Sequence, residues 1–261
     1  MTEERGVQPY QEPDSRLTLG QTQLDSSDLV MPRVKVVQAM SQEAQDGKAK
    51  QGEFWNTLTG ENYGESLRFI PLLPFKHRIF ILRDERRKDV ETFASSKGLV
   101  ITFSEGTGLK CRSLDFYQGI GEPGMECNAC PLKDWMDGGI PPYCSETYNL
   151  AAMTELGDLI ILSFSKSAAK VGKQAFSMLR LARGGGAAPW VNIYEAETSK
   201  RSNERGTFAV PAVRKVGETP PELLKVALQW AGQLAGTVID VSPIDEDAGG
   251  EGGAPATEPP F

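Results

Sequence analysis

The chain has 261 residues, of which 39% are hydrophobic and 24% are charged, as in an ordinary soluble globular protein. This length is enough for one or two domains with a real core. No apolar run approaches the roughly 18–20 residues of a membrane-spanning helix, and the polar N-terminus is unlike a signal peptide. Four cysteines are too few for a disulfide scaffold, and the single histidine, His77, excludes a two-histidine metal site.

The net charge of −7 divides unevenly along the chain. Residues 1–32 carry −4 and residues 240–261 carry −6, which leaves +3 for residues 33–239. We therefore expect a flexible acidic N-terminal arm (1–32), a mildly basic domain (33–239) and a disordered acidic C-terminal tail (240–261). A basic domain indicates an anionic ligand, although acidic ends that only keep the protein soluble would give the same division.

The first half of the domain is dominated by strand-like segments. Alternating side chains predict a strand over 33–40, and two more strands over 66–73 and 77–83. Proline cannot donate to a ladder, so we expect a bend, bulge or turn near Pro71–Pro74. Residues 99–104 predict another short strand. The polar, glycine-rich residues 41–64 between the first two strands predict a long loop.

Residues 105–147 break this pattern, because they hold all four cysteines and few aliphatic runs, and we interpret them as an inserted module. Beyond it, a buried strand is predicted at 158–165 and a helix at 166–183. Strands at 190–198 and 207–213 predict a hairpin, and a final helix spans 219–234.

This order of elements favours a mainly β fold with a few helices. It matches an OB-fold-like five-stranded barrel, here with an inserted four-cysteine zinc module at 105–147. Four aromatic side chains are expected in the core: Phe69, Phe80, Phe103 and Phe164.

The cysteines are spaced as Cys111-x15-Cys127-x2-Cys130-x13-Cys144. The Cys127–Cys130 pair can reach one ion, and the two outlying cysteines can complete a tetrahedron of thiolates around structural Zn²⁺. A metal would supply folding energy to a segment with little apolar material. An iron–sulfur cluster, a redox CxxC pair and unrelated buried thiols remain as alternatives. Four protein ligands would leave no open position for catalysis.

Basic residues lie near aromatic residues throughout the domain. A groove of cations with exposed rings is what single-stranded DNA requires, because bases stack on the rings and cations track the phosphates. Most such rings and charges in any chain are instead core or solvated surface. The candidate contacts are Trp55, Tyr63, Lys76, Arg78, Tyr148, Lys170, Lys173, Trp190, Tyr194, Lys200, Arg201 and Arg205.

The OB-like strand order, the four-ligand insert and the acidic tail ending in Phe261 together resemble the replicative single-stranded DNA-binding proteins of tailed phages. The tail is also similar to that of bacterial single-strand-binding proteins, with acids followed by Pro-Phe. The T4-type phage protein binds zinc through one His and three Cys, whereas this chain offers four Cys and has His77 outside the cluster.

The resemblance implies sequence-tolerant single-stranded DNA binding in replication or recombination, in the host cytoplasm and without a catalytic step. It also implies that the tail recruits replication and recombination proteins and competes with DNA. The tail residues concerned are Asp245, Glu246, Asp247 and Phe261.

Two other classes of function compete with this interpretation. The chain could be a zinc-ribbon module that binds RNA polymerase or a replication protein without nucleic-acid affinity of its own. An enzyme is not expected, because the sequence lacks a P-loop, a GxSxG elbow and a GxGxxG turn behind a strand. A nuclease could use scattered acids, but their spacing does not require it: Asp84, Glu85, Asp89 and Asp115.

Overall fold

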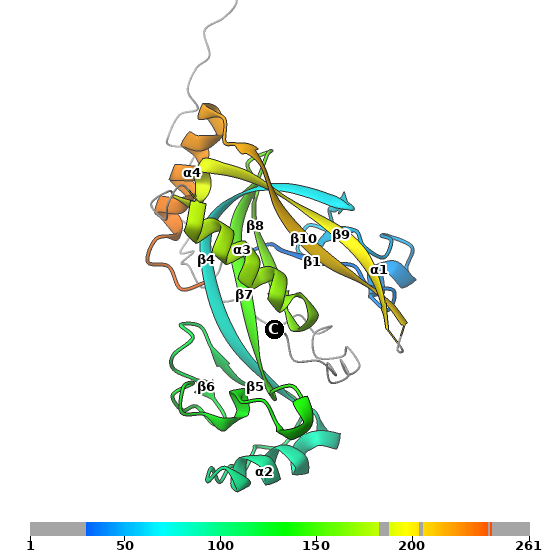
Figure 1. Ribbon diagram of the computed structural model, residues 1–261, viewed down its shortest axis with the longest axis vertical. Coiled ribbons are helices and arrows are strands. Elements are labelled where there is room, and N and C mark those ends of the chain that lie inside the picture. Colours follow the sequence, from blue (N-terminus) through cyan, green and yellow to red (C-terminus); the bar gives the residue numbers. More distant parts are fainter. Residues whose placement is uncertain (1–29, 183–187, 204–205, 240, 242–261) are drawn as a thin grey trace, which may run out of the picture. The chain divides into compact units, whose positions relative to one another are not determined.

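The computed structural model describes residues 30–182, 188–203, 206–239 and 241 (Figure 1). The chain divides into two units, Met1–Val30 and Met31–Phe261, and every element described below belongs to the second. Most of the predicted N-terminal arm and C-terminal tail therefore lies outside the described residues.

The second unit is built on one sheet. Its strands are β1 (Arg33–Val36), β2 (Phe54–Asn56), β3 (Asn62–Gly64), β4 (Ser66–Leu82), β5 (Gly108–Ser113), β6 (Ile120–Gly121), β7 (Cys144–Thr154), β8 (Leu159–Ser165), β9 (Asn192–Asn203) and β10 (Gly206–Glu218). Its α-helices are α1 (Gln42–Gln45), α2 (Arg87–Ser96), α3 (Ala169–Leu181) and α4 (Pro221–Leu234). The strand order is β10-β9-β4-β7-β8-β1-β2-β3, with β5 paired to β4 and β6 paired to β5.

The 17-residue strand β4 is the spine of the sheet (Figure 1). One edge of β4 pairs with β7 from Phe69 to Phe80. Its other edge pairs with β9 near its beginning and with β5 near its end. The register shifts between Pro71 and Leu73, so the expected irregularity at the prolines is confirmed as a bulge. The bulge allows one continuous strand where the sequence predicted two.

The two faces of the sheet bury separate cores. In β7, Leu150 and Ala152 join the cluster that packs against α3, whereas Ala151 and Met153 join the cluster that packs against α4. Successive side chains of a strand point to opposite faces, so β7 must be apolar on both sides. The predicted core phenylalanines are all buried: Phe69, Phe80, Phe103 and Phe164.

The mainly β class is confirmed by the described strands, but the predicted five-stranded barrel is not. They form a ten-stranded open sheet that is mixed because β1 runs parallel to β8. Strand β7 was not predicted from the sequence, because its first residues fall in the segment interpreted as an insert. Residues 99–104 are not a strand, and α2 was not predicted because its first turn belongs to a run of charged residues, 83–89.

Side-chain hydrogen bonds connect the β10 edge to the residues that follow β1. The Gln38 amide donates to the Ala209 carbonyl and accepts from the Ala209 N–H, both at 3.0 Å. Gln51 donates to the Thr207 carbonyl at 2.8 Å. These side-chain amides form hydrogen bonds with backbone groups at the edge of β10, as the backbone of a neighbouring strand would. No described helix is long and apolar enough to cross a bilayer.

Candidate metal centre and basic strip

The register of the sheet brings two of the cysteines together. Phe80 of β4 lies opposite Cys111 of β5 on one side and opposite Cys144 of β7 on the other. Residues directly opposite each other point to the same face of a sheet, so Cys111 and Cys144 flank Phe80 on one face. The other two cysteines form a tight turn, in which the Cys130 N–H donates to the Cys127 carbonyl at 3.3 Å.

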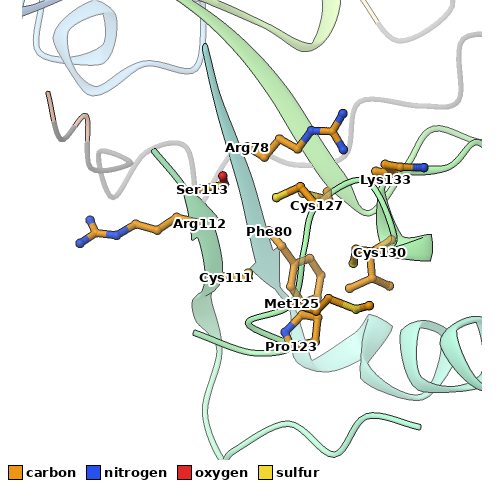
Figure 2. Close-up of a pocket in the computed structure, with 12 residues that line it drawn as sticks. Arg78, Phe80, Cys111, Arg112, Ser113, Pro123, Met125, Cys127, Cys130 and Lys133 are labelled. Atoms are coloured by element: carbon orange, nitrogen blue, oxygen red, sulfur yellow. The ribbon is translucent and has the colours of Figure 1, made fainter. Parts of the chain in front are cut away.

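All four predicted ligands, Cys111, Cys127, Cys130 and Cys144, line one cavity of about 20 Å³ (Figure 2). None of them is in a disulfide. Four thiols around a space the size of one small ion are a donor set that fits a closed zinc site. Within the described residues, however, no three His, Cys, Asp or Glu side chains form a ready ligand set. The sulfur atoms would have to move inward to bind a metal.

Burial disfavours the thiolate form of Cys111, Cys130 and Cys144 by raising their pKa values. It raises the pKa of Cys144 to about 12, with the nearby Arg78 charge opposing the rise. Burial also raises the pKa values of Cys111 and Cys130 above the ordinary value, against hydrogen bonds from backbone N–H groups. Because only the thiolate is a metal ligand, metal binding at this cavity must release protons.

The cysteine module, residues 99–143, shares a small core with the end of β4 and with α2. That core contains Phe80, Leu82, Val90, Ala94, Phe103 and Leu132. A close crossing within the module requires glycine, because a Cβ on Gly121 would lie 2.1 Å from the Lys110 carbonyl oxygen, at a φ of +107°. Of the six buried side chains in this core, Phe103 and Leu132 come from the module, so the module contributes few apolar side chains of its own.

Several predicted nucleic-acid residues meet around the Tyr148 ring. The Lys76 Nζ lies 4.9 Å from the ring centroid and the Lys173 Nζ lies 6.0 Å from it. Lys76 also pairs with Glu146 at 2.6 Å, and the Tyr148 hydroxyl donates to the same carboxylate at 2.8 Å. Burial works against ionisation of Glu146, but these two bonds outweigh it and lower the pKa of the carboxyl.

A groove lies between α3 and β10. It is lined by Lys170, Lys173, Gln174, Ser177, Met178 and Val213. Lys170 and Lys173 are exposed, so their ammonium groups can reach a ligand in the groove. We call Lys76, Lys170 and Lys173 the basic strip.

Phe116 is a site residue that the sequence analysis missed. Its ring centroid lies 3.9 Å from the Lys76 Nζ and 4.2 Å from the Arg78 Cζ. Its φ of +66° is unusual for a non-glycine residue. The Asp115 carboxylate holds this turn by accepting from the N–H groups of Tyr117 and Gln118 at 2.8 and 2.9 Å. Asp115 was the available signal, because aspartate favours such turns.

The predicted aromatic residues do not gather into a stacking surface. Tyr194 is only 2% exposed and stacks on Phe69 in the core, and Tyr148 is 4% exposed, so neither offers a free ring face. Trp190 packs against the α4-side core. Trp55 is half-buried in β2, and Tyr63 of β3 accepts a hydrogen bond from Asn56 of β2. The alternation of residues in a strand does not show which face of the sheet a helix covers. The sequence therefore could not show that these rings are buried.

The remaining predicted contacts lie elsewhere. Lys200 and Arg201 are exposed, but they belong to β9 and not to the predicted loop, because β9 extends to Asn203. Arg205 and the tail residues Asp245, Glu246, Asp247 and Phe261 lie outside the described residues. The structure thus brings Lys76, Arg78, Tyr148, Lys170 and Lys173 together.

In the comparison with known proteins, the family model of the Pam3 phage gp34-like proteins matches the chain over residues 3–98 and 142–239. The interruption between these two segments contains Cys111, Cys127 and Cys130. No curated protein and no solved structure matches the chain. Since the matched residues make up well over half of the sequence, the chain belongs to the family of Pam3 phage gp34-like proteins.

Proposed function

We propose that the protein binds single-stranded DNA through the basic strip, as a non-enzymatic factor in phage replication or recombination in the host cytoplasm. The observation that supports this is the approach of Lys76 from β4 and Lys173 from α3 to the same Tyr148 ring, beside a groove that Lys170 and Lys173 line. Cations gathered from elements that are far apart in sequence can follow a phosphate backbone.

The surroundings of the strip suit a flexible anionic chain. The ammonium groups of Lys170 and Lys173 line an open groove, where phosphates would displace bound counterions. The Phe116 ring beside Lys76 is half-buried, and is therefore more accessible than the rings of Tyr148 and Tyr194. The link between Gln38 and Ala209 supports comparison with the curved barrel of an OB domain.

We further propose that the four cysteines bind a structural zinc ion. An iron–sulfur cluster is the less favoured alternative. When bound, zinc would crosslink β5, β7 and the Cys127–Cys130 turn, and it would leave no open position for chemistry. Cys144 would hold it from β7, and Cys111, Cys127 and Cys130 would hold it from the cysteine module.

The test is fluorescence anisotropy of a labelled dT oligomer, titrated at several salt concentrations with duplex DNA in parallel. We expect tight, salt-sensitive binding to the single strand and weak binding to duplex. Replacing both Lys170 and Lys173 by Gln should weaken binding and reduce the slope of log K against log salt by about 0.7 for each phosphate that the protein no longer neutralises. Lys225→Gln is the matched control, because Lys225 is exposed on α4, across the sheet from α3.

If the double variant and the control bind alike, the groove is not the DNA site. If the wild-type protein does not bind the oligomer even at low salt, DNA binding itself is ruled out. That outcome would favour the second candidate function, a partner-binding metal module.

A specific observation supports this second function. Large apolar side chains of the cysteine module are open to solvent, with Tyr117 56%, Ile120 55% and Trp135 52% exposed. Exposed apolar residues gathered on a small module are common at protein–protein interfaces. An RNA polymerase or replication-protein surface would be the partner of such a module.

The proposed role of the acidic C-terminal tail is based on its sequence alone. We propose that Asp245, Glu246, Asp247 and Phe261 recruit replication or recombination proteins, with the terminal ring entering a pocket on the partner. These residues lie outside the part of the chain that the structure describes.

A further inference from the structure

Arg78 has an unusual environment for an arginine. It lies on β4 two residues before Phe80, and it lines the same cavity as the four cysteines. Its Nε and Nη1 atoms are buried and have no hydrogen-bond partner. Buried guanidinium N–H groups without acceptors are costly, so such an arrangement calls for an acceptor that is present in the working protein.

The cysteine site would supply that acceptor. Four thiolates around one Zn²⁺ carry a net charge of −2, and thiolate sulfur accepts hydrogen bonds. Groups in the shell outside the ligands commonly neutralise and orient such a site. We infer that Arg78 is the counter-cation of the four-cysteine site, a positioning residue that donates to the metal-bound sulfurs and offsets their charge. This inference rests on the proposed zinc site.

The other cations on the cavity are less well placed. Lys133 lines it too, but its Nζ is 2.5 Å from an Asp134 carboxylate oxygen. Figure 2 shows the guanidinium groups of Arg78 and Arg112 pointing to opposite sides, with Arg78 on the side of Cys127 and Cys130.

Phe116 helps to fix Arg78. Its ring centroid lies 4.2 Å from the guanidinium carbon, a contact typical of a cation over an aromatic face. The planar guanidinium is thereby held against the ring, beside the cavity. Arg78 would thus act on the metal site, whereas Lys76, Lys170 and Lys173 would act on DNA.

Metal affinity gives the direct test. Protein loaded with one Zn²⁺ is titrated with a chromophoric chelator, and the amount of zinc released gives the affinity. We expect Arg78→Gln to hold zinc about tenfold or more less tightly than wild type. Arg78→Lys keeps the charge but loses the planar fork, so an intermediate affinity is expected. Arg112→Gln removes the same charge from the opposite side and should match wild type.

A second readout separates this role from DNA binding. The salt slope for dT-oligomer binding should be the same for zinc-saturated Arg78→Gln and wild type, whereas it should fall for the Lys170/Lys173 double variant. In Co²⁺-loaded protein, the sulfur-to-metal charge-transfer band should shift in Arg78→Gln and not in Arg112→Gln.

Three outcomes would overturn the inference. The first is Arg78→Gln and Arg78→Lys retaining zinc as tightly as wild type, with unshifted cobalt bands. The second is a salt slope reduced in zinc-saturated Arg78→Gln, which would place Arg78 among the phosphate contacts. The third is a wild-type protein that binds neither zinc nor cobalt, which would remove the metal site as well but would leave the DNA-binding proposal standing on its own titration.

Discussion

Gly172 shows how closely α3 lies against the sheet. A Cβ added at this residue would lie 2.6 Å from the Tyr148 Cβ and 2.8 Å from the Phe164 Cβ, neither of which can rotate away. Alanine is the better helix former by about 1 kcal/mol, but overpacking a tight contact costs about 1–3 kcal/mol. We therefore predict that Gly172→Ala lowers the free energy of unfolding by up to about 2 kcal/mol, measured by urea denaturation.

The matched control is Gly232→Ala in α4. A Cβ at Gly232 would meet nothing within 4 Å, so this variant should gain about 0.5–1 kcal/mol from helix propensity and a less flexible unfolded chain. A Gly172→Ala variant as stable as Gly232→Ala would mean that α3 does not lie against Tyr148. The sequence predicted this helix from its apolar spacing, but the need for Gly172 depends on the distance between helix and sheet.

At the scale of elements, the sequence predicted what depends on local pattern. The helix at 219–234, the hairpin of β9 and β10, and the irregularity at the prolines all follow from neighbouring residues. Strand β7 does not, because Ser145, Glu146 and Thr147 make its first half look like loop. Its partners β4 and β8 decide its conformation through long-range pairing. The candidate metal site also depends on long-range pairing. The spacing of the cysteines in the sequence grouped them, but only the register of the paired strands places Arg78 beside them.

The turn at Asp115 gives a prediction with a pH dependence. The N–H groups of Tyr117 and Gln118 hold the pKa of the Asp115 carboxyl below its usual range, with help from the Ser113 hydroxyl. A carboxyl whose pKa is lower in the folded state stabilises the fold above its unfolded pKa of about 3.9, and loses this effect as the pH falls through the lower folded value. Since Asp115 is exposed, solvent screens this effect, and Asp115→Ala should cost at most about 1 kcal/mol at pH 7.

The comparison with Asp115→Asn separates charge from geometry. The asparagine keeps an acceptor oxygen for the turn, so it should lose less stability than Asp115→Ala at pH 7. The difference between wild type and either variant should shrink as urea denaturation is repeated below about pH 4. A difference that stays constant over this range would show that the ionised carboxylate does not support the turn that presents Phe116.

At the scale of the whole molecule, the interruption in the family match coincides with the cysteine module. The sheet strands other than β5 and β6 lie within the two matched segments, whereas Cys111, Cys127 and Cys130 lie between them. The two cores on the faces of the sheet contain no residue of the module. The sheet with α3 and α4 therefore lies in the part that the family model matches, and most of the module lies in the interruption, at the end of β4.

Metal removal should then act on the module and leave the sheet folded. In limited trypsin digestion, a chelator should speed cleavage after Lys110, Arg112 and Lys133, because the small core around Phe80 and Leu132 gives the module little stability of its own. Cleavage after Lys200 and Arg201, exposed on β9, serves as the internal reference and should not change. Cys127→Ser should reproduce the chelated pattern without a chelator. If both treatments leave the module as resistant to trypsin as before, then packing alone holds the module, and a metal bound by the four thiols does not stabilise it.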